Sequence, residues 1–190
     1  HLSIRRQRQM CIRDSYGNIA YSYRPGHADY TFDQKYGFRD YRGGGRSSGR
    51  ETIGRVAAGA IASKILEELG ISICTYTRSI GPVEIASFNK EEIHQNAFYM
   101  PDAQAAVKAG EYLEECMKNQ DSAGGVIECR ITGTPAGLGE PVFDKLSALL
   151  AHALMSIGAV KAVEIGDGIA VTSSNGSTDN DGFTVKDGEI

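Results

Sequence analysis

The sequence lacks several features that mark specialised classes of protein. No apolar run approaches the length that crosses a bilayer, which excludes a membrane-spanning helix. No secretory apolar stretch stands near the N-terminus and no C-x-x-C pair occurs, so we expect neither secretion, disulfides nor a metal site. We therefore interpret the four cysteines as thiols of a cytoplasmic protein: Cys11, Cys74, Cys116 and Cys129.

Two common nucleotide-binding signatures are also missing. The chain has no G-x-x-x-x-G-K-[ST] run and no G-x-G-x-x-G after a clear strand, which argues against a P-loop NTPase and a dinucleotide-binding fold. What remains is ordinary: 190 residues, 41% hydrophobic and 23% charged, enough to bury the core of one domain.

The net charge of −4 hides a basic region in an acidic chain. Residues 16–50 carry six basic side chains against three acidic ones, and residues 1–15 carry four against one. The remainder, 51–190, is therefore strongly acidic. Local positive charge on an acidic protein favours an anionic ligand over nucleic acid, which basic domains bind.

The basic region ends in the stretch RDYRGGGRSSGRET, which leads into a helical pattern. Glycines permit positive φ, and a helix N-terminus offers unpaired N–H groups and the positive end of the helix dipole. Ser47 and Ser48 add hydroxyls, and Arg46 and Arg50 add guanidinium groups that match phosphate or carboxylate oxygens. We expect the groups around 42–50 to converge into an anion-binding pocket.

Composition alone leaves two other interpretations of this stretch open. It could be a flexible loop whose arginine side chains are simply solvated. It could also be an Arg/Gly loop that binds RNA, in which case the affinity would fall steeply with salt and be equal across sequences.

A second candidate segment, RPGHADY at 24–30, places Arg24, His27 and Asp29 beside a Pro-Gly turn. A histidine in a tight basic loop can donate a proton near neutral pH. The plainer alternative is a histidine that only caps a turn. We expect the imidazole of His27 to point into the anion-binding pocket.

Hydrophobic periodicity predicts helices alternating with strands after a loop-rich start. Asp102 is placed to cap the second helix and Pro141 to open the third, on which Glu140 and Asp144 would share one face as N-terminal charges. The expected elements are short extended pieces and loops over 16–50, helices over 51–69, 103–118 and 141–157, strands over 71–77, 124–133 and 159–171, and a turn or bulge near the site at 164–168.

The first fifteen residues, HLSIRRQRQMCIRDS, have no usable periodicity and do not lead naturally into the residues that follow. A disordered basic arm is one interpretation. We expect instead a non-native leader over 1–15, with 16–190 forming the central part of a single domain.

Three long segments resemble chorismate synthases. The similarity runs from about Arg24 to the end of the chain and is specific because the segments are long. They are RPGHADYTFDQKYGFRDYRGGGRSSGRETIGRVAAGAIASKIL, GLGEPVFDKL at 137–146 and HALMSIGAVKAVEIGDG at 152–168.

The resemblance implies an α+β fold, a β-α-β sandwich with helices packed between antiparallel sheets, assembled as a homotetramer. It implies a lyase of the shikimate pathway, in aromatic amino acid biosynthesis. Members of the family convert 5-enolpyruvylshikimate-3-phosphate to chorismate and phosphate by anti-1,4-elimination. They require reduced FMN although the reaction has no net redox change, and NADPH is a possible source of electrons for the flavin.

The resemblance also assigns roles to individual positions. Gly49 stands where the family usually has alanine, a change from which we expect a mild effect. The assigned residues are His27 as the flavin-side proton donor, Arg46, Ser47 and Ser48 as flavin-binding residues, and Arg24 and Arg50 as substrate-binding residues.

Parts of the family pattern are not found in this chain. A second catalytic histidine, in a Gly-Glu-Ser-His-Gly motif, would precede residue 16, and a C-terminal part with a catalytic Arg/Asp pair would follow residue 190. We therefore expect a central fragment that is inactive alone. The alternative function is a flavin- or phosphate-binding fragment without turnover.

Overall fold

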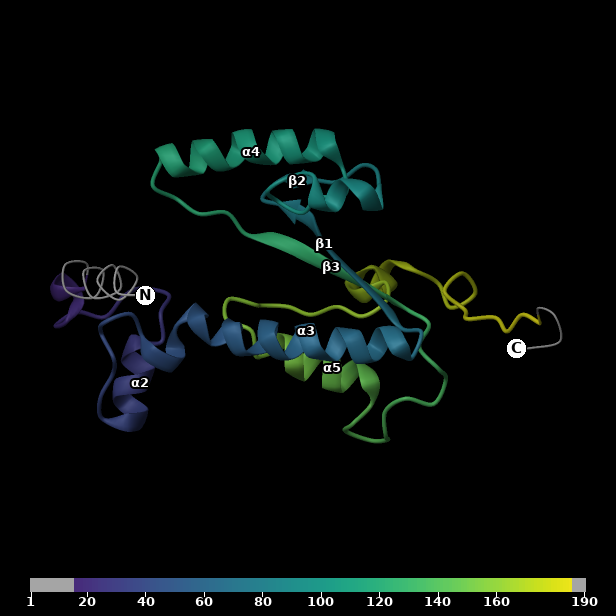
Figure 1. Ribbon diagram of the computed structural model, residues 1–190, viewed down its shortest axis with the longest axis horizontal. Helices are drawn as coiled ribbons and strands as arrows, with labels where there is room; N and C mark the ends of the chain where they lie inside the picture. The colour runs from purple at the N-terminus through teal and green to yellow at the C-terminus, as the bar shows by residue number, and fades with distance from the viewer. Residues whose placement is uncertain (1–15, 186–190) are drawn as a thin grey trace. The chain divides into compact units, whose positions relative to one another are not determined.

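The computed structural model describes residues 16–185 (Figure 1). The expected non-native leader, 1–15, lies outside the described residues. The chain divides into two compact units, the first taking in the described residues up to Ala57 and again from Gly137, the second Ala58–Ala136. Within the described range, no helix has the length and apolar character needed to cross a membrane.

An antiparallel three-stranded sheet forms the centre of the second unit (Figure 1). Its strands are β1 (Ser72–Ile80), β2 (Val83–Glu84) and β3 (Gly125–Thr132), in the order β2-β1-β3. β1 and β3 pair along their whole lengths, with one bulge near Thr77. The strands predicted over 71–77 and 124–133 are thereby confirmed.

Helix α4 (Ala103–Lys118) supplies the core of the second unit. Small side chains on one face of α4 let it approach the loop before it and the β1–β2 hairpin closely. The predicted helix over 103–118 is confirmed. The buried cluster consists of Met100, Ala105, Ala106 and Ala109, packed against Ile80, Val83, Ile85 and Phe98.

The Asp102 carboxylate joins the start of α4 to the loop after β2. Its Oδ1 accepts hydrogen bonds from the backbone N–H groups of Gln104 and Ala105, at 2.9 and 3.0 Å. Its Oδ2 accepts from the N–H groups of Ala86 and Ser87, both at 3.0 Å. These hydrogen bonds stabilise the charged carboxylate, and the one from Ala105 has the largest effect. Burial acts in the opposite direction but is outweighed, so the pKa of Asp102 falls from 3.8 to about 2. The predicted cap is confirmed.

The first unit begins differently from expectation. We expected only extended pieces and loops over 16–50, but residues Asp29–Tyr36 form helix α2. Asp29 lies in its first turn and Lys35 in its last, so both charges complement the helix dipole. Gly37 ends the helix in the left-handed region, at φ +74°, which glycine adopts without strain.

Helix α3 (Thr52–Glu68) confirms the helix predicted over 51–69. It ends at Gly70, whose φ is +76°, and the N–H of Ile71 donates to the carbonyl of Leu66 at 2.8 Å. The apolar side chains whose periodicity predicted the helix remain largely exposed in this chain: Ile53, Val56, Ile61 and Ile65.

The third predicted helix starts later than expected. Helix α5 spans Leu146–Met155, and Pro141 lies before it in a bend of the chain, not at its first position. The N–H of Glu140 donates to the carbonyl of Asp144 at 2.8 Å, a bond that folds this segment back on itself. The expectation that Glu140 and Asp144 share a helix face is therefore wrong.

The strand predicted over 159–171 is also wrong. Residues 160–165 have no regular structure, Gly166 and Asp167 form a turn, and a 3₁₀ turn follows at Gly168–Ser173. Gly166 and Gly168 adopt φ values of +63° and +56°, which interrupt an extended chain. Among the described strands, none pairs with this segment. The turn expected at 164–168 is confirmed.

Acid should weaken the second unit through Asp102. Because folding lowers the pKa of this carboxyl, its stabilisation is complete above pH about 4 and is lost as the pH falls toward the folded value, about 2. We expect Asp102→Asn to lower the free energy of unfolding near neutral pH by about 2 kcal/mol and to flatten its dependence on pH between 4 and 2. Urea titrations of intrinsic fluorescence at a series of pH values measure both effects.

Asp121→Asn is the matched control, because Asp121 is exposed and, among residues 16–185, its carboxylate accepts only from the neighbouring N–H of Ser122. It should change the free energy of unfolding by less than about 0.5 kcal/mol. Equal effects of the two substitutions would contradict the role given to Asp102.

Candidate functional site

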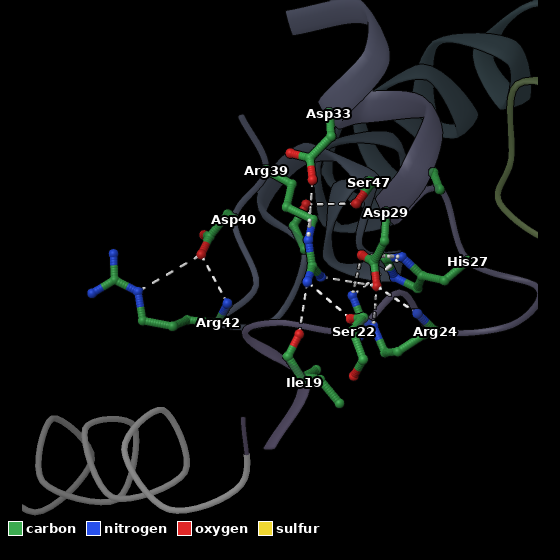
Figure 2. A network of polar contacts seen from close by, with 12 residues as sticks. Ile19, Ser22, Arg24, His27, Asp29, Asp33, Arg39, Asp40, Arg42 and Ser47 are labelled. Atoms are coloured by element: carbon green, nitrogen blue, oxygen red, sulfur yellow. Dashed lines mark hydrogen bonds and ion pairs between the residues drawn. The ribbon is translucent and has the colours of Figure 1, made fainter. Parts of the chain in front are cut away.

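The candidate site lies in the first unit, where the loop before α2 meets the glycine–arginine loop (Figure 2). At its centre is Asp29, the first residue of α2, with a side chain only 2% exposed. Arg24 grips this carboxylate with two nitrogens: Nε donates to Oδ2 and Nη2 to Oδ1, each at 2.8 Å. The backbone N–H of Arg24 also donates to Oδ2, at 3.1 Å.

Arg39 approaches Asp29 from another side. Its Nη1 lies 3.2 Å from Oδ2 of the carboxylate, and its side chain is 8% exposed. Its Nη2 donates to the carbonyls of Ile19, Ala20 and Ser22, at 2.7, 3.1 and 2.9 Å. Arg39 therefore ties the segment before the site to the start of α2.

These contacts keep Asp29 ionised. The hydrogen bonds from Arg24 hold the pKa of the Asp29 carboxyl well below its usual range, although burial acts in the opposite direction. A buried carboxylate is stable only where cations and donors compensate it, and here Arg24 and Arg39 do so.

The His27 ring contacts two parts of the site. Its Nδ1 meets Asp29 and Arg24, and its Cε1 and Nε2 atoms lie against the glycine run. Its Nδ1 lies 2.9 Å from Oδ1 of Asp29 and 3.1 Å from Nη2 of Arg24. A Cβ atom added to Gly44 would lie 3.2 Å from Cε1 and 3.4 Å from Nε2. The imidazole thus bridges the Asp29 network and the glycine–arginine loop.

The glycine run adopts a conformation that other residues disfavour. Gly43, Gly44 and Gly45 have φ values of +106°, +85° and +50°. The N–H of Gly44 donates to the carbonyl of Asp40 at 2.8 Å, and Oγ of Ser47 donates to the carbonyl of Gly44 at 2.7 Å. The loop therefore closes around Gly44, which is buried.

The last residues of the glycine–arginine loop lead directly into α3. Ser48 caps a 3₁₀ turn by accepting a hydrogen bond from the N–H of Arg50 at 3.1 Å, and the turn runs into Thr52, the first residue of α3. The side chain of Arg50 reaches back, so that its Nη1 lies 3.6 Å from the position of a Cβ on Gly43.

The structure brings together some of the predicted groups and separates others. Arg24, His27 and Ser47 lie around Gly44 and Asp29, and Arg50 returns to Gly43, whereas the Arg46 side chain is exposed. Figure 2 shows Arg42 extending away toward Asp40, 3.8 Å from its carboxylate, with 61% of the side chain exposed. We expected all the groups around 42–50 to converge into one anion-binding pocket, and this expectation was too broad.

Two residues of the network had no assigned role in the sequence. Asp29 was visible beside the Pro-Gly turn, but no pattern indicated that its carboxylate would be buried. Arg39 had no local signal, because its partners come from residues up to twenty positions earlier in the chain. Only the folded loops bring those partners together.

The site contains two kinds of arginine, which differ in whether the guanidinium group is paired with a carboxylate. Arg24 and Arg39 are paired with Asp29, whereas Arg46 and Arg50 are exposed on the loop that leads into α3. Exposed guanidinium groups beside glycine backbone and serine hydroxyls suit a phosphate or carboxylate ligand. His27 offers a group that can move a proton at the boundary between the two.

Comparison with known proteins gives consistent results. A family model described as chorismate synthase matches residues 3–189. The chorismate synthases of Agathobacter rectalis and Lachnoclostridium phytofermentans are each 64% identical to this chain, over 177 and 170 residues. These alignments cover 92% and 88% of this chain but 48% and 46% of the relatives. The chain thus spans about half the length of the curated relatives it matches.

A solved structure, a crystal structure of chorismate synthase, resembles the fold with a TM-score of 0.77 at 30% sequence identity. The match covers 85% of this chain and 53% of that chain. Together with the helices and the antiparallel sheet, it confirms the expected α+β fold of the chorismate synthase type, present here in part.

A methyl group at Gly44 should disrupt the contact between His27 and the glycine run. Gly44→Ala would place its Cβ 2.9 Å from Oγ of Ser47 and 3.2 Å from Cε1 of His27, in a left-handed backbone. We expect the free energy of unfolding to fall by about 1–3 kcal/mol. Urea titration measures the loss.

Gly49→Ala provides the comparison within the same loop. No atom lies within 4 Å of a Cβ at Gly49, so alanine should be tolerated with a change below about 0.5 kcal/mol. If alanine were tolerated equally at Gly44, the close packing of His27 on the loop would be refuted.

Proposed function

This chain belongs to the chorismate synthase family, and we propose that it is the central part of an enzyme that makes chorismate. The complete protein would convert 5-enolpyruvylshikimate-3-phosphate to chorismate and phosphate by anti-1,4-elimination, a lyase step of the shikimate pathway. The observation that best supports a role for this part is the His27 ring packed on Gly44 of the glycine–arginine loop.

The proposed roles follow the family resemblance and agree with the geometry. His27 is the catalytic proton donor, with Nε2 on the side of the glycine run. Arg46, Ser47 and Ser48 bind the cofactor, and Arg50 binds the substrate. For Arg24, Nε and Nη2 are bonded to Asp29, so Nη1 is the nitrogen left for a substrate anion.

The residues present fit reduced FMN. Three consecutive glycines with positive φ leave backbone without Cβ atoms, and exposed arginine side chains and half-buried serine side chains stand beside them. This donor set matches a flavin phosphate. When bound, reduced FMN would supply electron density transiently, which is why a reaction without net oxidation would need a reduced cofactor.

The arginines would act on the departing phosphate. Its negative charge grows as the carbon–oxygen bond breaks, so guanidinium donors held in place stabilise the transition state more than the bound substrate. The Asp29 carboxylate holds the Arg24 guanidinium in place. The Ser48 hydroxyl holds the backbone N–H group of Arg50. His27 holds a proton at Nε2 next to the same loop.

The remaining features of the proposal rest on the family resemblance. The complete protein would assemble as a homotetramer in the cytoplasm and serve aromatic amino acid biosynthesis. NADPH would be a source of electrons for the flavin. The second candidate function is a fragment that binds flavin or phosphate without turnover, favoured by the half-length coverage of the relatives.

A chimaera tests the proposal directly. This chain replaces the matching half of the Agathobacter rectalis relative, to which it is 64% identical, so that the remaining segments of the relative complete the enzyme. We expect chorismate formation from 5-enolpyruvylshikimate-3-phosphate with reduced FMN, followed by its absorbance. His27→Ala should lower kcat about 100- to 10,000-fold, because the proton donor is lost.

His94→Ala is the matched control, since His94 is exposed in the second unit and, in the described part of the chain, its ring pairs only with that of Tyr99 among the aromatic groups. Its kcat should stay within about twofold of the unsubstituted chimaera. An inactive chimaera that still binds FMN would favour the second candidate function. Binding to RNA of any sequence, lost steeply with salt, would favour the RNA-binding loop instead.

A further inference from the structure

The Asp29 carboxylate has no role in the proposed reaction, yet it contacts three functional or basic side chains. Its side chain is 2% exposed, and its two oxygens lie within 3.2 Å of Arg24, His27 and Arg39 (Figure 2). A buried carboxylate costs free energy unless it is fully paired, so a purely structural role would be served as well by apolar packing. The arrangement around His27 suggests a more specific role.

The proton on the neutral His27 ring is placed by Arg24. The guanidinium Nη2 lies 3.1 Å from Nδ1 in hydrogen-bond geometry, while Asp29 lies at ion-pair distance from the same nitrogen. An arginine side chain only donates hydrogen bonds, so Nδ1 must accept. A neutral imidazole has one proton, which is therefore on Nε2, the nitrogen beside Gly44.

Asp29 is what holds Arg24 in the position to do this. The carboxylate accepts from Nε, Nη2 and the backbone N–H of Arg24, three bonds of 2.8, 2.8 and 3.1 Å. A two-pronged arginine–carboxylate pair fixes the plane of the guanidinium as well as its position. Without the carboxylate, the flexible arginine side chain could leave Nδ1.

Asp29 also touches the ring directly, because its Oδ1 lies 2.9 Å from the same nitrogen, Nδ1. The charged groups that face the ring are Asp29 and Arg24, with Arg39 behind Asp29. The carboxylate therefore contacts both the ring and the arginine that donates to it.

We propose that Asp29 is a positioning residue for His27: its carboxylate holds Arg24 against Nδ1, so that Nε2 keeps a proton and presents it at the glycine run. This inference rests on the proposed function for its catalytic consequence. Its structural part, the position of the proton on the ring, can be measured without any activity.

Asp33 provides a matched control. It lies one turn later on α2, and its carboxylate also faces Arg39, at 3.5 Å from Nε. Asp29→Asn and Asp33→Asn thus each remove one negative charge beside the same arginine. Only Asp29 contacts Arg24 and His27, so only its substitution should alter the ring.

The first measurement is the tautomer of His27, from the ¹⁵N shifts of the ring in the 190-residue chain above the pH at which the ring loses its charge. We expect an unprotonated Nδ1 and a protonated Nε2 in the unsubstituted chain and in Asp33→Asn. In Asp29→Asn the two shifts should move toward each other, as both tautomers become populated. A protonated Nδ1 in the unsubstituted chain, or identical shifts in all three proteins, would overturn the proposal.

The second measurement is turnover in the chimaera. Asp29→Asn should lower kcat about 10- to 100-fold because the proton donor is misplaced, and it should raise KM as well because Arg24, a proposed substrate-binding residue, loses the carboxylate that holds it. Asp33→Asn should stay within about twofold. If the unsubstituted chimaera is active and the two variants behave alike, the positioning role fails while the proposed function stands. If the chimaera is inactive, the ring shifts still decide the positioning role.

A third variant tests the same contact in case the Asp29→Asn protein does not fold. Arg24→Lys keeps a positive charge next to Asp29 but removes the planar group that reaches both the carboxylate and Nδ1. It should also move the ring shifts toward each other. Unchanged shifts in a folded Arg24→Lys protein would equally overturn the proposal.

Discussion

The site of the first unit depends on one buried negative charge. Asp29 stands at the start of α2, where the helix dipole favours an anion, and it is compensated by Arg24 and Arg39. Each partner in turn fixes another segment: Arg24 meets the His27 ring, and Arg39 binds the carbonyls at 19–22. Without this carboxylate, the positive guanidinium groups of Arg24 and Arg39 would repel each other, because the negative charge that attracts both would be gone.

The second unit uses a buried carboxylate for a different purpose. Asp102 is surrounded by backbone N–H groups and not by arginines, so it joins the start of α4 to the loop after β2 without drawing any cation to it. The difference has a physical consequence. A carboxylate held by backbone amides fixes only the main chain, whereas one held by arginines also fixes the side chains that can touch a ligand.

Elements with strong local patterns were predictable. α3, β1, β3 and α4 follow from apolar spacing, β-branched alternation and the Asp102 cap, because these signals act over a few residues. α2 was missed since its apolar residues show no clear period, although Gly37 and the charges at its two ends could have indicated it. The segments around Pro141 and 159–171 were misassigned because local propensity does not decide whether a helix turn or a strand finds its partners.

The sequence was sufficient to identify the family, the residue types of the site and the need for glycine at positions 43–45, because long motifs and left-handed backbone leave local traces. The fold alone decided which arginine pairs with Asp29, that Arg42 turns away, and that the His27 ring rests on Gly44. These pairings join loops separated along the chain. Their energies depend on burial and on distances between side chains, which no short stretch of sequence specifies.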